Sequence, residues 1–384
     1  MTNGGVQITP ATTDAQRRAF ARFPWRLYRN DPNWVPPLFG DRVKLLTPGQ
    51  HPFHEHADVQ LFLAEQGSEV VGTISAHVNH RHNEIHDDKV GFFGFFETVN
   101  DPRVAGALLD TAAGWLCEQG MDAIRGPENF SQNEEVGLLV DGYDAPPVIM
   151  MTYNPPYYRD LIEGAGLQKA QDLWAWILRT DIFDKDVQRL PQKFLHVADQ
   201  ARKRPNLVVR NIDMKNWDRE VQIAKEVYNK AWEVNWGFVA MTDHEIEHLG
   251  DELKFIVDPD IVYIAELDGK PVGICLGVPD VNQAMRRARP QPNSWSLPVT
   301  LARFLLNRRK IDTFRLMIMG VIPEYRALGI DALFYVETAR SAFRKGYDWC
   351  EMSWILESND MMNRIIERLG GTIYKTYRVY EKPL

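Results

Sequence analysis

The strongest constraint on the fold of this chain is an internal repeat. The segment AEQGSEVVG, from Ala64 to Gly72, resembles AELDGKPVG, from Ala265 to Gly273, and the Ala, Glu, Val and Gly residues match at the same spacing. In each segment, residues that favour β-strands flank a glycine-bearing turn, which is typical of a β-hairpin. Two copies of one hairpin, about 200 residues apart, predict two copies of one larger unit.

Two shorter matches support the repeat. Asn33–Trp34 corresponds to Asn235–Trp236, and IEGAG, which ends at Gly166, corresponds to IERLG, which ends at Gly370. Similarity between single hairpins arises by chance, but three matches in the same order and at nearly the same offset do not. The length of 384 residues also suits two domains. We therefore predict an N-terminal domain at 1–182, a connector at 183–205 and a C-terminal domain at 206–384.

The order of strands and helices predicts an α/β fold with a mixed sheet in each domain. In the second copy the strand NLVVRNI and the repeated hairpin precede the strand FRLMIMGVI. A helix from about Ile330 to Lys345 follows, and the strands DWCEMSWIL and TIYKTYRVYEK complete the copy. The first copy follows the same order. We expect two tandem domains, each a mixed, mostly antiparallel sheet flanked by helices.

The composition excludes several kinds of partner. The formal net charge of −8 gives no overall basic footprint for nucleic acid, and no apolar run approaches the length of a membrane span. Cys117, Cys275 and Cys350 lie far apart in apolar stretches, which predicts buried free thiols in a reducing compartment. We expect a cytoplasmic protein with no nucleic-acid partner, and the sequence leaves a homodimer open.

One stretch of the second copy predicts a phosphate site. GVIPEYRALGIDALF, from Gly320 to Phe334, reads as a strand, a short glycine turn and a helix. Such a turn presents backbone N–H groups and the positive end of the helix dipole to a phosphate. Gly329 lets the backbone approach a ligand because it has no Cβ. The alternative is a tight turn whose helix is stabilised by Asp331 in its first turn.

This turn resembles the acyl-CoA signature of the GNAT superfamily of N-acetyltransferases, V-x-P-x-x-[RQ]-x-x-G-x-[GA]. Val321, Pro323, Arg326 and Gly329 match the signature, whereas Asp331 replaces its final small residue. A second family mark is an asparagine eleven residues before the glycine that closes the next helix, and Asn359 precedes Gly370 by that distance. The resemblance implies two tandem GNAT-like domains, of which the C-terminal one binds acetyl-CoA or another acyl-CoA. The cofactor-binding residues that it implies are Met319, Gly320, Val321, Arg326, Ala327, Leu328, Gly329, Ile330, Asp331 and Asn359.

The resemblance also implies a reaction, namely direct transfer of the acyl group to the amine of a small molecule or peptide. Ile366 stands where many members carry the tyrosine that protonates the departing thiolate, so Tyr374 and Tyr377 are candidate substitutes. Glu351, on the strand after the cofactor helix, is the candidate base for the amine proton.

The acceptor site is expected between the first two helices of the second copy. Trp232, Trp236 and Phe238 flank the flexible Gly237 and can form an apolar wall for the acceptor. Packing of the same three residues as a core between the copies is an equally good interpretation.

The first copy lacks the phosphate turn. Asn100, Asp101 and Pro102 provide helix-starting chemistry but no arginine and no glycine loop, so we expect this copy not to bind acyl-CoA. Its role would be structural, or it would wall off the substrate site. An acyltransferase is the leading hypothesis. Together with Ile366, the missing turn of the first copy suggests an alternative function, a CoA-binding or scaffold protein without catalysis. A tandem transferase that uses aminoacyl-tRNA is the third hypothesis.

Two motifs with metal-site spacing are explained more simply, and we expect no metal. HEIEH, from His244 to His248, matches a zinc-protease pattern, but Thr242 and Glu245 form a capping box that accounts for the glutamate. Seven of the ten histidines lie between His51 and His86, where a polar surface is favoured over a metal site.

A basic insertion interrupts the second copy between residues 282 and 310. It contains six arginines in a protein of net negative charge, and it suits an anionic substrate or an acidic membrane surface. We favour the alternative, a helical arm that packs on the other copy through Phe304, Leu305 and Leu306.

Overall fold

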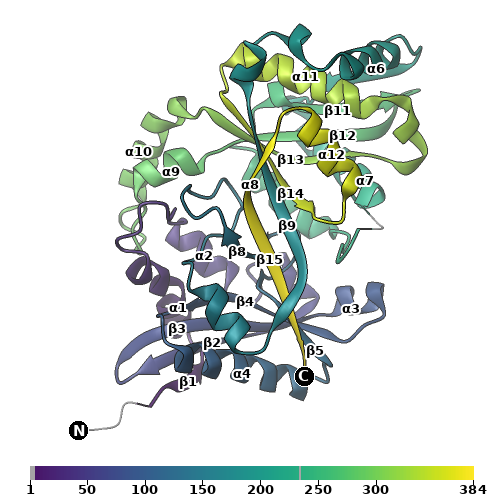
Figure 1. Cartoon of the computed structure of the whole chain (residues 1–384). Coiled ribbons are helices and arrows are strands. Elements are labelled where there is room, and N and C mark those ends of the chain that lie inside the picture. The colour runs from purple at the N-terminus through teal and green to yellow at the C-terminus, as the bar shows by residue number, and fades with distance from the viewer. Residues whose placement is uncertain (1–4, 233–234) are drawn as a thin grey trace. The chain divides into compact units, whose positions relative to one another are not determined.

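The computed structural model describes residues 5–232 and 235–384, which form two compact units (Figure 1). Unit 1 comprises Met1–Leu173, Asn282–Arg309 and Lys375–Leu384, and unit 2 comprises Trp174–Val281 and Lys310–Tyr374. Neither unit is one continuous stretch of the sequence. Two long strands, β9 (Gln168–Arg179) and β15 (Thr372–Pro383), each begin in one unit and end in the other. The connector expected at 183–205 lies inside unit 2, and most of the basic insertion lies inside unit 1.

The sheet of unit 1 is antiparallel except at one pair of strands. β1 (Gln7–Pro10), β2 (Ala57–Gln66), β3 (Glu69–Asn79) and β4 (Val90–Thr98) pair antiparallel in this order. β4 then pairs parallel with β5 (Ala123–Gly126), which pairs antiparallel with the end of β15. The remaining elements of unit 1 up to Leu173 are α1 (Asp14–Leu27), α2 (Phe39–Leu45), α3 (His80–His86), α4 (Pro102–Glu118), α5 (Tyr158–Gly164), β6 (Glu128–Asn129), β7 (Glu135–Val136), β8 (Leu138–Asp141) and the short helix η1 (Pro52–Glu55).

Unit 2 repeats this pattern. β10 (Leu207–Asn211), β11 (Val262–Leu267), β12 (Lys270–Pro279) and β13 (Thr313–Val321) pair antiparallel, and β13 pairs parallel with β14 (Trp349–Leu356). The helices are α6 (Gln192–Arg202), α7 (Trp217–Trp232), α8 (Asp243–Leu253), α11 (Ile330–Lys345) and α12 (Asp360–Arg368), with short helices η2 (Thr180–Phe183), η3 (Val187–Arg189), η4 (Met214–Asn216), η5 (Pro259–Ile261), η6 (Arg308–Lys310, whose last residue begins this part of unit 2) and η7 (Pro323–Leu328).

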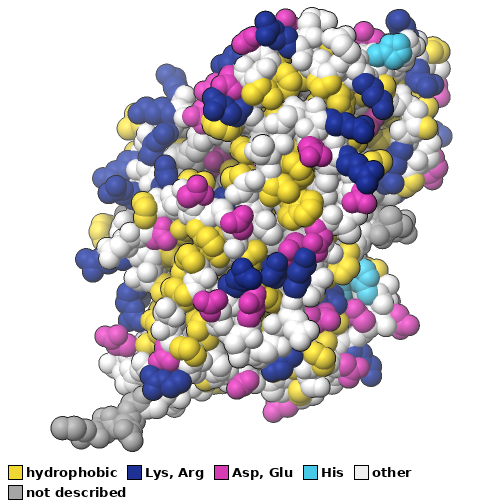
Figure 2. Space-filling model, in the orientation of Figure 1, with side chains coloured by type: hydrophobic (Ala, Val, Ile, Leu, Met, Phe, Trp, Pro, Cys, Tyr) yellow, Lys and Arg dark blue, Asp and Glu magenta, His cyan; other side chains and the backbone are white. Residues whose placement is uncertain are grey.

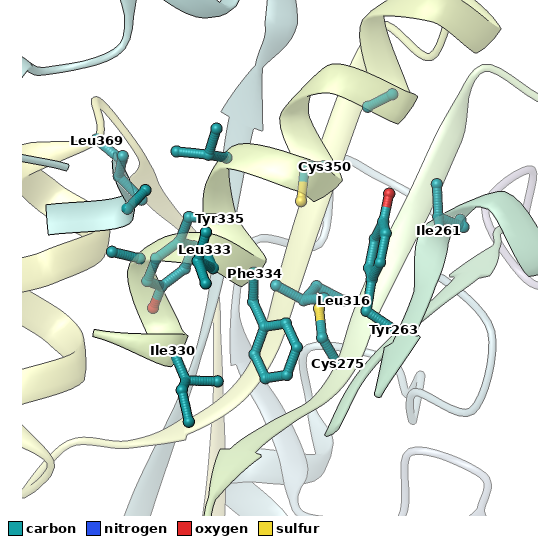
Figure 3. Packing of buried hydrophobic residues seen from close by; sticks show 14 of the residues in the cluster. Ile261, Tyr263, Cys275, Leu316, Ile330, Leu333, Phe334, Tyr335, Cys350 and Leu369 are labelled. Carbon is teal, nitrogen blue, oxygen red and sulfur yellow. The ribbon is translucent and has the colours of Figure 1, made fainter. Parts of the chain in front are cut away.

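The core of unit 2 lies between α11 and the sheet. Leu333 and Phe334 of α11 pack with Cys275 of β12 and Leu316 of β13, and all four side chains are buried (Figure 3). The helix predicted from about Ile330 to Lys345 is confirmed at both ends. It ends at Gly346, whose positive φ of 81° is the left-handed conformation that glycine adopts at helix C-termini.

The predicted repeat is confirmed in the geometry of the two hairpins. The pairing of β2 with β3 shifts register between Ala64 and Glu65, and that of β11 with β12 shifts between Ala265 and Glu266. Matched bulges at matched positions are a feature of one fold present twice. The mixed α/β fold, with mostly antiparallel strand pairing in both units, is therefore confirmed. Strands of both units belong to one 13-stranded sheet.

Three local predictions have separate outcomes. The capping box of Thr242 and Glu245 is confirmed at the start of α8. The prediction that all three cysteines are buried is wrong for Cys117, which is exposed, since it lies on the outer side of α4. Within the described ranges, none of the helices is long and apolar enough to cross a membrane.

The basic insertion also differs from its expected packing. It forms α9 (Asn282–Ala288) and α10 (Leu297–Asn307). Leu305 and Leu306 are 57% and 76% exposed, so the prediction that they pack on another part of the chain is wrong. The helix instead turns Thr300 inward, where it is buried.

Candidate functional site

The central strand of unit 2 has a free edge beside the predicted cofactor turn. β13 pairs with β14 only from Thr313 to Leu316, and within residues 5–232 and 235–384 no pairing with β14 continues beyond Leu316. β13 itself runs on to Val321. The two parallel strands therefore part, and the backbone of Met319 and Gly320, two of the cofactor-binding residues that the resemblance implied, lies along the gap.

The predicted phosphate turn folds as a short helix, η7, followed by α11. No side chain caps α11, so the N–H groups of its first turn are available to an anion. Ala327 is exposed, and Gly329 has a φ of +77°, which favours glycine. These features fit the phosphates of an acyl-CoA.

Two residues of the turn are held by protein contacts. Arg326 Nε donates to the Val321 carbonyl at 3.1 Å, and Arg326 Nη2 donates to the Ala231 carbonyl at 2.8 Å. A Cβ on Gly329 would lie 2.8 Å from Cγ1 of Val197 on α6. The neighbouring helix α6 thus packs closely against Gly329. Arg326 links the turn to the end of α7.

The remaining cofactor candidates lie around this turn. Leu328 and Asp331 are half-buried, and Ile330 is fully buried. Burial, together with the charge of Asp331, raises the pKa of Tyr335. Asn359 is the N-cap of α12, where its side chain accepts a hydrogen bond from the Met362 N–H at 3.2 Å.

Glu351 and Tyr374, two of the three catalytic candidates, are brought together in unit 2. The Tyr374 hydroxyl donates to Glu351 Oε1 at 3.4 Å, and the Ser353 hydroxyl donates to Oε2 at 2.9 Å. Arg315 Nε lies 3.8 Å from Oε2, and both members of this ion pair are buried. Tyr377 is placed apart from them, fully buried in unit 1.

Two of the predicted acceptor residues cluster around Tyr228. Its ring lies 4.9 Å from that of Trp232 and 5.5 Å from that of Phe238. Trp232 covers Gly320, since a Cβ on that glycine would overlap the indole. Trp236, which lies between Trp232 and Phe238 in the sequence, is half-buried. Residues 233–234 lie outside the described residues.

A cavity of about 200 Å³ lies within unit 1. Most of its wall is apolar, and it includes side chains from α1, β4 and α9. The apolar residues that line it are Phe20, Pro24, Trp25, Trp34, Phe96, Leu138, Met150, Met151 and Met285. Among the polar side chains in the wall, Arg42 and Glu135 form an ion pair at 3.3 Å, whereas Glu97 of β4 makes no ion pair within the described residues.

Glu97 has one carboxylate oxygen fixed and one open. The hydroxyls of Tyr28 and Tyr158 each donate to Oε2 at 2.7 Å. Oε1 has no hydrogen-bond partner among the residues that the structure describes, and the side chain lines the cavity. Burial raises the pKa of Glu97 to about 7, although the two tyrosine hydrogen bonds lower it. A carboxylate with such a pKa in a largely apolar cavity is a candidate ligand-binding or proton-accepting group.

Sequence reasoning missed this site. Its only local signal is a glutamate in the otherwise apolar strand VGFFGFFETV. The partners Tyr28 and Tyr158 lie about 70 and 60 residues away in the chain, and nothing in their spacing joins them to Glu97.

No metal centre accompanies these sites. Among the described residues, no group of three or more His, Cys, Asp or Glu side chains could hold a metal ion. His80 pairs with Asp58 at 2.9 Å, and burial lowers the pKa of His77 and His82 to about 3. His77 and His82 therefore belong to the packed interior of unit 1.

Comparison with solved structures defines the class of protein. A tandem GNAT protein from the clavulanic acid biosynthesis pathway aligns with a TM-score of 0.57 over 98% of both chains, at 11% identity. A GCN5-related N-acetyltransferase from Sphaerobacter thermophilus aligns with a TM-score of 0.51 over 98% of this chain and 95% of its own, at 13% identity. The fold is thus that of tandem GNAT proteins, as the resemblance implied.

Comparison with characterised sequences defines the family. No protein-family model matches the chain. Bacterial ceramide synthase of Caulobacter vibrioides is 37% identical over 393 aligned positions, which cover 100% of this chain and 99% of that protein. Protein YghO of Escherichia coli K12 is 38% identical over 96% of this chain and 93% of its own. The chain belongs to the family that contains these two proteins.

Proposed function

We propose that this chain is an acyl-CoA-dependent N-acyltransferase whose acceptor is a long-chain amine. The observation that carries the proposal is the 37% identity to bacterial ceramide synthase along essentially the whole of both chains. A ceramide is the amide of a fatty acid and a long-chain amino alcohol, so its synthesis requires an amine acceptor and an activated acyl group. We propose an acyl group longer than acetyl on the basis of the same comparison.

The geometry of unit 2 supports acyl-CoA as the donor. The uncapped start of α11 suits the phosphates, and the free edge of β13 at Met319 and Gly320 suits the pantetheine arm. We place the remaining cofactor contacts along η7 and the first turn of α11, from Arg326 to Asp331, with Asn359 at the next helix. The cytoplasm is the proposed compartment, because acyl-CoA and reduced thiols are found there.

The proposed proton-transfer groups of unit 2 are Glu351 and Tyr374. Because the Tyr374 hydroxyl donates to Glu351, the two side chains form one pair that can pass a proton. Tyr374 is half-buried whereas Glu351 and Tyr377 are fully buried, so Tyr374 is the member that a substrate can reach. Trp232 lies over Gly320, and we assign it, together with Trp236 and Phe238, to an apolar wall that faces a lipid chain.

The test is thiol release from acetyl-CoA and palmitoyl-CoA in the presence of a long-chain amino alcohol or a short amine, with the amide identified by mass spectrometry. We expect amide formation from palmitoyl-CoA and the long-chain acceptor, and much slower reaction with the other combinations. Binding of acyl-CoA in calorimetry with no amide from any combination would contradict the proposal and favour a CoA-binding scaffold.

A further inference from the structure

We propose that the cavity of unit 1 binds the amine end of a long-chain amine, with the ammonium group on Oε1 of Glu97. This inference rests on the proposed function, since it assigns a place to the acceptor of that reaction. The N-terminal domain, expected to be structural on sequence grounds, then contributes a substrate site of its own.

The Glu97 carboxylate is fixed in direction and has one oxygen open. Oε2 is held by the hydroxyls of Tyr28 and Tyr158 at 2.7 Å, which fixes the direction of the group. Oε1 lacks a hydrogen-bond partner among the described residues, and Glu97 lines the cavity. A carboxylate oxygen that is fixed in position at a cavity wall, with no donor of its own, is available to a ligand that donates to it. Its negative charge selects a cationic donor.

The rest of the cavity wall suits a hydrocarbon chain. Trp25, Trp34, Phe96 and Met285 line the same cavity as Glu97, and they offer aromatic and thioether surface to a hydrocarbon chain. Arg42, the cation that lines the cavity, is already paired with Glu135. A ligand with one cationic head and an apolar chain therefore matches both parts of the cavity.

The cavity of unit 1 is not a second cofactor groove. In unit 1 the gap between the parting strands is filled, because Asn129 Oδ1 accepts a hydrogen bond from the Phe95 N–H at 2.7 Å. A Cβ on Gly94 would overlap the Glu128 carbonyl oxygen, so β6 lies directly against β4 there. The backbone that would hold a pantetheine arm is thus already paired, and an amine suits the remaining space better than an acyl-CoA.

The test compares octylamine with octanol by calorimetry on the full chain. The two probes share one alkyl chain and differ in the cationic head. We expect octylamine to bind at least about tenfold more tightly, and we expect Glu97→Gln to remove this preference. Glu128→Gln is the matched control, because Glu128 is also a buried carboxylate of unit 1 whose pKa burial raises to about 7, but it does not line the cavity.

Equal binding of the two probes, or an octylamine preference that survives in Glu97→Gln, would overturn the proposal. These outcomes are separate from failure of the proposed function, since neither probe needs acyl-CoA. If the protein forms the amide but Glu97→Gln binds octylamine as tightly as the wild-type chain does, the proposed function is retained and this site is refuted.

A second observation, independent of the cavity, concerns the surface of α9 and α10. We propose that this arm docks on an anionic lipid bilayer. Unlike an ordinary surface helix, α10 turns apolar side chains outward, and Trp295 before it is 82% exposed. The other exposed apolar residues of the arm are Leu297, Val299, Leu301, Leu305 and Leu306.

The charge of the arm favours a bilayer over a second copy of the chain. Residues 281–311 contain no acidic residue, and their arginines are exposed, whereas the whole chain has a net charge of −8. Lys and Arg side chains gather over α9 and α10 (Figure 2). An exposed apolar face with a basic rim and a tryptophan suits the headgroup region of an anionic membrane. A second copy would bring the same positive charges together.

The arm also lies next to the proposed amine site. Met285 of α9 lines the cavity, and the indole N–H of Trp25, another lining residue, donates to the carbonyl of Pro290 in the arm at 3.0 Å. Docking on lipid would thus place the cavity beside the phase that holds a long-chain amine.

Vesicle flotation tests this second proposal with phosphatidylcholine vesicles that contain or lack phosphatidylglycerol. We expect the full chain to float only with the anionic vesicles, and we expect the Leu305→Glu, Leu306→Glu double variant to remain in solution. Phe255→Glu is the matched control, because Phe255 is 78% exposed on unit 2. No flotation would overturn the proposal, and so would self-association that the double variant abolishes.

Discussion

The two units differ at one equivalent position of their sheets. In unit 1 the hairpin glycine Gly72 pairs with Thr98, and Glu97 is the residue before it. In unit 2 the matching Gly273 pairs with Val321, and Gly320 is the residue before it. Glu97 thus corresponds to Gly320. Unit 1 presents a carboxylate to a cavity, whereas unit 2 has a glycine under the indole of Trp232.

The two units also differ in whether the edge of the central strand is paired next to this position. In unit 2, β13 keeps an unpaired edge toward β14 beyond Leu316, in the part of the chain that the structure describes. In unit 1, Asn129 fills the corresponding gap by pairing with Phe95. The comparison teaches that the copies kept one scaffold while their sites diverged, with an amine site proposed in unit 1 and an acyl-CoA site in unit 2.

Loss of the carboxylate in unit 1 is the change with the largest expected effect. In Glu97→Gln the side chain can still accept the hydrogen bonds from Tyr28 and Tyr158, but it can no longer pair with an ammonium. We expect kcat/KM for the long-chain amine to fall roughly 100-fold, the scale on which buried charge pairs lose one partner. Steady-state kinetics with the amine varied measure this loss. An unchanged kcat/KM would remove Glu97 from the acceptor site.

The hairpin glycines give a matched pair of stability changes. A Cβ at Gly72 would lie 2.7 Å from Leu108 and 3.0 Å from the Glu97 carbonyl, whereas one at Gly273 would lie 3.2 Å from the ring of Phe334. We expect Gly72→Ala to cost about 2 kcal/mol of unfolding free energy and Gly273→Ala about 1 kcal/mol. Denaturant titrations provide the values, and a larger cost at Gly273 would contradict the assigned packing.

Introduction of a negative charge at the turn of unit 2 is expected to have a smaller effect. Gly329 is unsuitable for this test because a side chain there meets Val197, but Ala327 is exposed. We expect Ala327→Glu to raise KM for acyl-CoA about tenfold through repulsion of the phosphates, and Ala327→Lys to leave it equal or lower. Kinetics at low salt resolve the pair. Equal effects of the two variants would place the phosphates elsewhere.

The smallest expected effect is that of pH on amine binding. Burial raises the pKa of Glu97 to about 7, so the carboxylate gains its charge as the pH rises through 7. Octylamine stays cationic over this range, and its affinity should rise several-fold from pH 6 to pH 8. The other groups that act on Glu97 are Tyr28, Tyr157, Tyr158, Arg42 and Glu135. Calorimetry at both values measures the change, and the Glu97→Gln variant should show none.

Much of the fold could be predicted from the sequence because it depends on local patterns. The hairpin repeat carries its own bulge and glycine, and the helix at Ile330–Lys345 follows from its apolar spacing and the glycine after it. The non-contiguous units could not be predicted in this way. β9 and β15 pass from one unit to the other because of the distant strands with which they pair, and no local sequence pattern predicts that pairing.

The candidate sites also differ in how far the sequence could predict them. The turn at Arg326–Asp331 is contiguous, so a motif reveals it. Arg315, which lies opposite Glu351 on the neighbouring strand, and Glu97 with its two tyrosines come together only through tertiary packing. The sequence placed Val197 in a connector, yet its side chain covers Gly329 and shapes the cofactor turn.

The central claim, that each unit holds a different substrate, is tested most directly by one calorimetric experiment. Octylamine and palmitoyl-CoA are each titrated into the wild-type chain, Glu97→Gln and Ala327→Glu. The account predicts that Glu97→Gln loses affinity for octylamine alone and that Ala327→Glu loses affinity for palmitoyl-CoA alone. If either variant instead weakened the other ligand, or both ligands equally, the assignment of one substrate to each unit would be contradicted.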